Sequence, residues 1–415
     1  MLFKAHELAT AMCPAGWTRV RLAEIAQEVS VRAGHDTALP VLSVTKHRGI
    51  VKAEDYFSKA VHGRDTSNYK IVRAGDFAYA TIHLDEGSLG RHTDTPSGIV
   101  SPMYTVFEVT AGFDPYYLET LLRSPKSIVT YGSLGQGTVN RRASISFSAF
   151  SGLVLQHPPL PEQKKIAAIL SSVDEVIAKT EAVIAQLQIV KKAMMEQLLT
   201  KGMPGRHTRF KQTEIGEIPE EWEVASVRDV AKSVVPGRNK PSVFDGTIPW
   251  LTIADLQHTV VTDSSAGLRV SQTELNNCGG KTVPAGTVIM SCVGRLGIVS
   301  ISGCIVTMNQ QLHGFACGPS IDPLFLCLVL RSAERQMQAL AGKTTIPYLN
   351  KARCEEIVIP LPCLPEQRAV AEQIAPIETS LASEEAVLLQ MRHLKSALSS
   401  SLLSGELRVI PEVAE

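Results

Sequence analysis

The chain contains an internal duplication, and this repeat constrains its fold more than any other feature of the sequence. The tetrapeptide Leu-Pro-Glu-Gln at residues 160–163 recurs at 364–367, and the two copies continue from there without a gap. Two further matches lie upstream in the same order and at nearly the same offset, about 205 residues: Trp17 with Trp222, and Asp114-Pro115 with Asp322-Pro323. A repeat of this length indicates one fold present twice.

Each Leu-Pro-Glu-Gln tetrapeptide is predicted to begin a long helix. Proline suits the first turn of a helix, where no backbone N–H is required. Apolar residues then recur at alternating steps of four and three, which is the heptad pattern of a coiled coil. Two rungs are polar in both copies, Thr180 with Glu384 and Lys191 with Lys395. The expected packing residues are Ile166, Leu170, Val173, Ile177, Leu187 and Leu198 in the first copy, and Val370, Ile374, Ile377, Leu381, Leu388 and Leu398 in the second.

The linker between the copies favours an antiparallel arrangement of the two helices. About 40 helical residues span roughly 60 Å, so a parallel pair would require residues 201–221 to return that distance almost fully extended. Gly202, Pro204 and Gly205 instead indicate a linker that turns. We therefore expect a long antiparallel helical coiled coil with a pseudo-two-fold repeat. The alternative is that each helix packs only on its own globular part.

Each globular part, called a head below, combines strands with short helices, so the predicted fold class is α+β with two mixed α/β heads. Each Asp-Pro pair is typical of an N-cap followed by a first-turn proline, and so predicts a helix. Strand candidates are 41–44, 77–82 and 99–109 in the first head, and 248–253, 287–293 and 298–308 in the second. The expected organisation is a first head at 1–159, a first spacer helix at 160–200, a linker at 201–221, a second head at 222–363, and a second spacer helix with a C-terminal tail at 364–415.

The composition narrows the possible classes of protein. Because 41 basic residues balance 41 acidic ones, no overall field attracts nucleic acid, and any such site must come from local clusters. Residues 1–16 show no secretory signal, and no apolar run approaches the roughly 18 residues of a membrane span, so we expect a cytoplasmic protein. The eight cysteines include no Cys-x-x-Cys pair, so we expect reduced thiols and no metal site.

The sequence carries none of the catalytic motifs that we sought, and no catalytic residue is predicted. Gly342-Lys343-Thr344 resembles the end of a phosphate-binding loop, but Met337 stands where that loop requires glycine. His6-Glu7 begins a zinc-protease string, but Thr10 replaces the second histidine. These departures favour a binding protein over an enzyme, although an enzyme with a site of another kind stays open as a third interpretation.

Clusters of basic and amide side chains are the best candidates for binding contacts. Arg and Lys contact phosphates or guanine, and Asn and Gln can pair with adenine. Similar clusters are common on solvated surfaces, but here they occur at comparable places in both heads. The predicted contact residues are Lys46, Arg48, Arg91, His92, Thr138, Asn140, Arg141 and Arg142 in the first head, and Arg238, Lys240, Arg295, Gln310, Gln311, Lys343, Thr345, Asn350 and Lys351 in the second.

With these motifs in this order, the chain resembles the specificity subunit of type I restriction–modification systems. The resemblance covers the whole chain. It rests on the two Leu-Pro-Glu-Gln helix starts with the prolines before them, at 158–159 and 359–362. It rests further on the central stretch from Leu198 to Trp222, and on the closing segment Leu402-Leu403-Ser404-Gly405.

The resemblance implies two target-recognition domains, each reading one half of a bipartite DNA sequence. It also implies that the helices dock methyltransferase subunits, usually two, and that restriction subunits with motor and nuclease activity join the complex. S-adenosylmethionine, ATP and Mg would then belong to the partner subunits, with no cofactor in this chain. The alternative is a coiled-coil scaffold whose heads bind proteins or small ligands and do not contact DNA.

Overall fold

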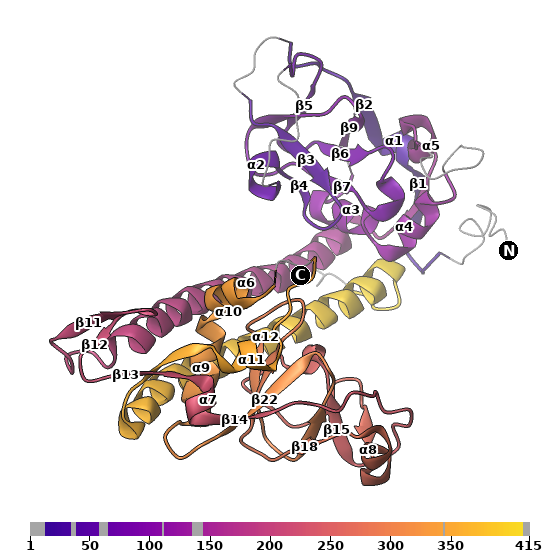
Figure 1. Cartoon of the computed structure of the whole chain (residues 1–415). Helices are drawn as coiled ribbons and strands as arrows, with labels where there is room; N and C mark the ends of the chain where they lie inside the picture. The colour runs from indigo at the N-terminus through magenta and orange to yellow at the C-terminus, as the bar shows by residue number, and fades with distance from the viewer. Residues whose placement is uncertain are drawn as a thin grey trace, which may run out of the picture. The chain divides into compact units, whose positions relative to one another are not determined.

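A computed structural model describes residues 13–34, 39–57, 65–109, 112–134, 144–342 and 345–409 (Figure 1). The chain divides into two compact units. Unit 1 comprises residues 1–179 and 389–415, and unit 2 comprises residues 180–388. Each unit therefore contains one head, the first half of the helix that follows it, and the last half of the other long helix.

The two long helices are α6 (Leu160–Lys201) and α12 (Leu364–Ser404). They pack together, and their direction can be read within each unit. In unit 2, Lys191 near the end of α6 forms an ion pair of 2.6 Å with Glu378 in the first half of α12. In unit 1, Lys395 near the end of α12 forms an ion pair of 2.5 Å with Asp174 in the first half of α6. The antiparallel pairing predicted from the linker is therefore confirmed.

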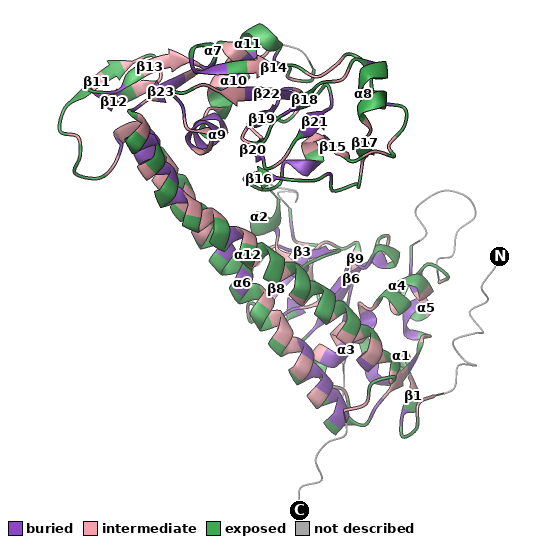
Figure 2. Cartoon of the chain, turned by 90° about the horizontal axis from the view of Figure 1, so that it is seen from below, coloured by how far each residue is buried: buried purple, intermediate pink, exposed green. Residues whose placement is uncertain are grey.

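Buried, intermediate and exposed residues alternate along both helices, as the bands in Figure 2 show. Ile166, Leu170, Val370 and Ile374 are completely buried. The buried rungs are not restricted to apolar residues, because Thr180 is 7% exposed. The remaining packing residues are buried or half-buried: Val173, Ile177, Leu187, Leu198, Ile377, Leu381, Leu388 and Leu398.

The first head is built on a four-stranded antiparallel sheet of order β2-β9-β6-β7. Phe77, Tyr79, Phe107 and Phe150 form an aromatic core between this sheet and the short helices. The strands are β1 Thr18–Arg21, β2 Ala26–Val29, β3 Leu42–Thr45, β4 Gly49–Lys52, β5 Lys70–Arg73, β6 Phe77–Ala80, β7 Leu89–Arg91, β8 Ser97–Val100, β9 Tyr104–Val109 and β10 Val154–His157. The helices are α1 Leu22–Ile25, α2 Ala53–Tyr56, α3 Pro115–Leu122, α4 Pro125–Tyr131 and α5 Phe147–Ser151, with a 3-10 turn η1 Leu84–Glu86.

The second head contains a five-stranded sheet of order β14-β22-β19-β20-β16 and a four-stranded sheet of order β17-β15-β21-β18. The helix α9 (Pro323–Ser332) packs its buried face on the first of these sheets. The strands are β13 Glu223–Ser226, β14 Ala231–Val234, β15 Ile248–Leu251, β16 Val260–Val261, β17 Arg269–Val270, β18 Thr282–Val283, β19 Val288–Ser291, β20 Val299–Ser302, β21 Val306–Met308, β22 Leu312–Cys317 and β23 Val358–Leu361. The helices are α7 Val227–Val230, α8 Gln272–Cys278, α10 Glu334–Leu340 and α11 Lys351–Glu355, with a 3-10 turn η2 Ile253–Asp255.

Both heads share the same frame, although their sheets differ. In each, the strand that enters the head pairs antiparallel with the strand that leaves it toward the long helix: β1 with β10, and β13 with β23. The predicted Asp-Pro helices are α3 and α9, each capped by its aspartate. The α+β fold class with a repeated pair of mixed domains is therefore confirmed.

Three local expectations were wrong. The stretches 99–109 and 298–308 each contain two strands, because a turn at Pro102 and another at Gly303 interrupt them. The linker does more than turn, since β11 (Phe210–Thr213) and β12 (Gly216–Pro219) form an antiparallel hairpin within it.

Among the residues that the structure describes, no helix is long and apolar enough to cross a membrane.

Replacement of Ile374 by alanine tests the packing of α12 in the core that it shares with the end of α6 and the second head. Ile374 is completely buried, so we expect Ile374→Ala to lower the free energy of unfolding by about 2–5 kcal/mol. Ile189 on α6 is 63% exposed, and Ile189→Ala should cost less than about 1 kcal/mol. Chemical denaturation of both variants measures the difference, and equal losses would contradict the packing of Ile374 in this core.

Candidate functional site

The duplicated glutamine attaches each head to the start of its long helix. In unit 1, Gln163 accepts a hydrogen bond from the backbone N–H of Asp114 at 3.0 Å and donates to the carbonyl of Pro158 at 3.0 Å. In unit 2, Gln367 accepts from the N–H of Asp322 at 2.7 Å and donates to the carbonyl of Pro362 at 2.8 Å. Both glutamine side chains are completely buried. The two motifs matched in the sequence repeat, Asp-Pro and Leu-Pro-Glu-Gln, therefore contact each other directly in each unit.

The neighbouring glutamate holds the segment that follows the end of the other helix. In unit 2, Glu366 is 2% exposed and accepts hydrogen bonds from Trp222 Nε1 at 3.1 Å and His207 Nε2 at 2.7 Å. In unit 1, Glu162 is 3% exposed and accepts two hydrogen bonds from Arg408, from Nε at 2.8 Å and Nη2 at 2.9 Å. Each buried carboxylate thus has hydrogen-bond donors, as burial of a charge requires.

Glycines in the left-handed conformation redirect the chain into both junctions. Gly202 follows α6 with φ of 72°, and Gly405 follows α12 with φ of 76°. This conformation is costly for other residues and is common just after the end of a helix. The short motif Leu-Pro-Glu-Gln is therefore a structural junction, and its side chains are already occupied within the chain.

Replacement of Gln367 by alanine tests this junction. The variant would leave the buried N–H of Asp322 and the carbonyl of Pro362 without their partner, and each such loss costs roughly 1–3 kcal/mol. We expect the free energy of unfolding to fall by at least about 2 kcal/mol. Gln373 on the same helix is exposed, so Gln373→Ala is the matched control and should change stability by less than about 0.5 kcal/mol. A Gln367→Ala variant as stable as this control would contradict the role of the junction.

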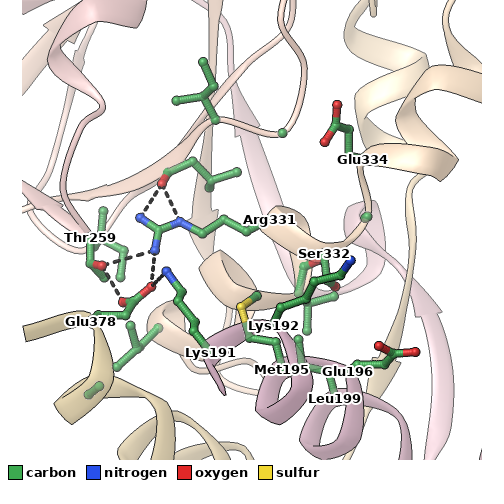
Figure 3. A pocket seen from close by; sticks show the side chains of 18 of the residues that line it. Lys191, Lys192, Met195, Glu196, Leu199, Thr259, Arg331, Ser332, Glu334 and Glu378 are labelled. Atoms are coloured by element: carbon green, nitrogen blue, oxygen red, sulfur yellow. Dashed lines mark hydrogen bonds and ion pairs between the residues drawn. The ribbon is translucent and has the colours of Figure 1, made fainter. Parts of the chain in front are cut away.

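A buried cluster of charges ties the second head to both long helices, and Figure 3 shows it at one wall of a groove of about 1940 Å³. Glu378 of α12 receives Lys191 of α6 at 2.6 Å, Arg331 of α9 at 2.5 Å and the hydroxyl of Thr259 at 2.5 Å. Arg331 also donates from Nε to the carbonyl of Val299 on β20 at 2.9 Å. One carboxylate of α12 therefore holds α6, α9 and the loop that contains Thr259 together.

Opposing effects act on the pKa of Glu378. Burial raises it, but attraction to Arg331 and hydrogen bonds from Lys191 and Thr259 outweigh burial and hold the pKa of this carboxyl below its usual value. The carboxylate is therefore ionised at neutral pH. The cluster also explains why the helix seam carries a lysine at this rung.

Unit 1 has the same helix ion pair with different surroundings. Asp174 and Lys395 have side chains that are 37% and 34% exposed, whereas those of Glu378 and Lys191 are 9% and 24% exposed. Asp174 accepts a hydrogen bond from the hydroxyl of Tyr116 on α3. Arg123, at the position of Arg331 in the repeat, donates to backbone carbonyls of the first head instead. The helix register is thus identical in both copies, while the attachment of the head differs.

The variants Glu378→Gln and Asp174→Asn test whether burial determines how much each of the two equivalent helix ion pairs contributes to stability. Removing the charge of Glu378 leaves Lys191 and Arg331 uncompensated, so we expect a loss of about 3 kcal/mol at pH 7. The more exposed Asp174→Asn should cost about 1 kcal/mol or less. Because the folded-state pKa of Glu378 is lowered, its contribution is present above the unfolded pKa of about 4.3 and is lost as pH falls through the folded value.

Stability measured from pH 7 down to pH 3 checks this prediction. The difference between the wild type and Glu378→Gln should be largest at neutral pH and should shrink in acid. A difference that stays constant over this range would show that the charge of Glu378 contributes nothing to the fold.

The structure brings together two of the predicted contact clusters of the first head. Lys46 and Arg48 are exposed in the turn between β3 and β4. This turn meets β7 so closely that a Cβ at position 90 would lie 2.7 Å from the Cα of Gly49. Arg91, the last residue of β7, is therefore beside the turn, where its Nε lies 3.7 Å from a carboxylate oxygen of Glu119. Arg91 thus lies next to the turn, but its side chain is only 21% exposed and its Nε is buried.

His92 is a correction to the predicted contacts. Its side chain is only 1% exposed and is hydrogen-bonded to the hydroxyl of Thr95 at 3.0 Å. Burial lowers the pKa of this imidazole, so it is neutral and structural rather than a surface contact. The predicted contacts Thr138, Asn140, Arg141 and Arg142 lie outside the described residues.

In the second head, three polar loops come together at one edge of the five-stranded sheet, and we call them the rim loops: residues 292–297, 309–311 and 345–350. Cys292 N–H donates to the carbonyl of Gln311 at 2.8 Å, which joins the first two loops. Gly294 N–H donates to the carbonyl of Pro347 at 2.9 Å, which joins the first and third. The predicted contacts Arg295, Gln310, Gln311, Thr345 and Asn350 all belong to these loops, and Lys351 follows directly.

Several predicted contacts of the second head already have structural partners. The side chain of Asn350 caps α11 by accepting from the N–H of Arg353 at 2.9 Å. The side chain of Gln310 donates to the carbonyl of Gly237 at 2.9 Å, which joins the segment containing Arg238 to the rim. Lys240 lies over the ring of Trp250 at 5.8 Å. Arg238, Arg295, Thr345 and Lys351 are exposed, and Lys343 lies outside the described residues.

The described residues hold no group of three or more side chains suited to a metal ion. All eight cysteines are free thiols. Burial raises the pKa of Cys292 to about 11 and that of Cys327 to about 11, so these thiols are protonated and behave as core residues.

Comparisons with known proteins identify the family. Residues 50–188 and 219–390 match the model of the type I restriction modification DNA specificity domain, which thus occurs twice. The chain belongs to this family. It is 28% identical to the type I restriction enzyme MjaVIII specificity subunit of Methanocaldococcus jannaschii over 71% of each chain. It is 22% identical to the type I restriction enzyme HindI specificity subunit of Haemophilus influenzae over 81% of this chain and 88% of that one.

Solved structures support the same fold. The S subunit of a type I restriction–modification system from M. genitalium matches with a TM-score of 0.61 at 12% identity, covering 94% of this chain and 99% of that one. A chain from a study of complex assembly in the type I R-M system matches with a TM-score of 0.52 at 18% identity, covering 95% of this chain and 100% of that one. The chain is therefore a DNA-recognition subunit of the type I class, which has no catalytic activity of its own, as the sequence predicted.

Proposed function

We propose that each head of this subunit reads one half of a bipartite DNA target, while the long helices dock methyltransferase subunits. The observation that carries the proposal is that the junctions are duplicated whereas the heads diverge. Gln163 and Gln367 make equivalent contacts, but the main sheet has four strands in one head and five in the other. Two heads that are attached in the same way but differ in their sheets fit a DNA target whose two parts differ in sequence.

The partners and cofactors are part of the same proposal. Two methyltransferase subunits match the two copies of the helix pattern, and restriction subunits would complete the complex in the cytoplasm. S-adenosylmethionine, ATP and Mg would be bound by those partners, because the sequence carries no motif for them.

An exposed apolar stripe on the long helices supports the docking. On α6, Val183 and Val190 are 46% and 37% exposed and lie seven residues apart, on one face. On α12, Val387 and Leu394 are 37% and 43% exposed at the matching positions of the repeat. Exposed apolar residues that recur along a helix are typical of a surface that another helix covers.

A double variant, Val183→Lys with Val190→Lys, tests the stripe. Lysine at both positions removes apolar contact area and adds charge to the docking surface, so co-purification with the methyltransferase subunit should fall by at least about tenfold. Ala185 is exposed on the same helix and points about 200° away from Val183. Ala185→Lys is therefore the control and should retain the partner, and equal retention by the double variant would refute docking at this stripe.

The function itself is tested with the complex of this chain and its methyltransferase partner. We expect salt-sensitive binding to duplex DNA, because phosphate contacts release counterions. Methylation mapping in a host with and without the gene should reveal a motif of two separated parts. An absence of DNA binding together with an unchanged methylation pattern would favour the protein-binding scaffold instead.

A further inference from the structure

The third rim loop of the second head exposes two large apolar side chains. Ile346 is 60% exposed and Tyr348 is 52% exposed. A soluble protein tolerates single exposed apolar residues, but two that are separated by one residue in a polar loop indicate a contact surface.

The loop holds Tyr348 in a defined position. Tyr348 forms an antiparallel bridge with Val293. On either side of it, Pro347 accepts from the N–H of Gly294 at 2.9 Å, and Leu349 donates to the carbonyl of Cys292 at 2.9 Å. The side chain of Leu349 is only 1% exposed and anchors the loop in the core. The outward direction of Tyr348 is therefore built into the backbone pairing.

The chemistry around these two residues fits DNA better than it fits an apolar partner. Arg295 and Gln311 of the other rim loops are exposed, as are Thr345 and Lys351 on either side of Ile346 and Tyr348. The acid beside them, Glu355, lies 3.5 Å from the amine of Lys351. Cationic and amide groups that surround apolar side chains are the combination that contacts phosphates and base edges together.

We infer that Ile346 and Tyr348 contact bases in the half-site that the second head reads. The inference rests on the proposed function and extends it to a specific surface. Apolar side chains discriminate bases through the thymine methyl group or by packing against a base step. The exposed cations of the rim then contact the phosphates, which position the loop without reading sequence.

The test uses the complex with methyltransferase subunits and a duplex that carries the motif mapped for the wild type. Ile346→Ala and Tyr348→Ala should each bind this duplex roughly tenfold more weakly, the usual effect of losing one base contact. Binding to a duplex of scrambled sequence should change less than about twofold, because the cations remain. Tyr348→Phe should bind like the wild type, since the ring makes the contact.

Ile305 supplies a matched control, because it is 59% exposed in the same head outside the rim loops. Ile305→Ala should bind both duplexes like the wild type, and the thermal stability of all variants should be unchanged, because the altered side chains are exposed. Methylation mapping should show relaxed preference in one half of the motif only.

The possible failures are distinguishable. If the wild-type complex binds no motif, the proposed function fails. If the wild type binds but Ile346→Ala and Tyr348→Ala behave like Ile305→Ala, base contact by this loop is overturned. Equal losses on the target and the scrambled duplex would also overturn it, because a base contact must change the ratio between them. A Tyr348→Phe variant as weak as Tyr348→Ala would overturn the role of the ring.

Discussion

The buried glutamine at the start of each long helix is the interaction on which the rest of the architecture depends. Its side-chain amide accepts a hydrogen bond from the backbone N–H of the aspartate that caps the head's helix. The same amide donates a hydrogen bond to the carbonyl of the proline before the long helix. An amide can do both because it has an acceptor and donors on one short side chain. The glutamate beside it holds the segment that follows the other helix, through His207 in unit 2 and Arg408 in unit 1. In each copy, the head, the start of its long helix and the segment that follows the other long helix therefore meet at one junction.

The two copies show how a duplicated frame accommodates different heads. The helix ion pairs keep one register in both units, yet Glu378 is buried under the second head while Asp174 stays partly open to solvent. The second head contacts α12 through Arg331 and Thr259. The first uses Tyr116 and turns Arg123 toward its own backbone. The contacts between each head and the long helices therefore differ between the two copies, whereas the pairing of the helices is the same.

Much of the frame could be predicted from the sequence because it is periodic or local. The heptad spacing predicted the long helices, and the linker length predicted their relative direction. Each Asp-Pro pair predicted a helix capped by its aspartate. The partners of the polar rungs could not be read, because the acid that meets Lys191 lies far away in sequence. Surface clusters were less informative. His92 is buried and Asn350 caps a helix, since residue type alone does not reveal what a side chain already binds.

The matched ion pairs have a consequence for how such a chain can evolve. An insertion in one helix alone would move Lys191 past Glu378 or Lys395 past Asp174, and would place lysine against the apolar rungs. The two helices can therefore change length only in concert. The heads face no such restriction, because each returns to its own junction through a strand pair of its own. A head can therefore be exchanged as a module while the apolar seam and the two ion pairs of the helices stay unchanged.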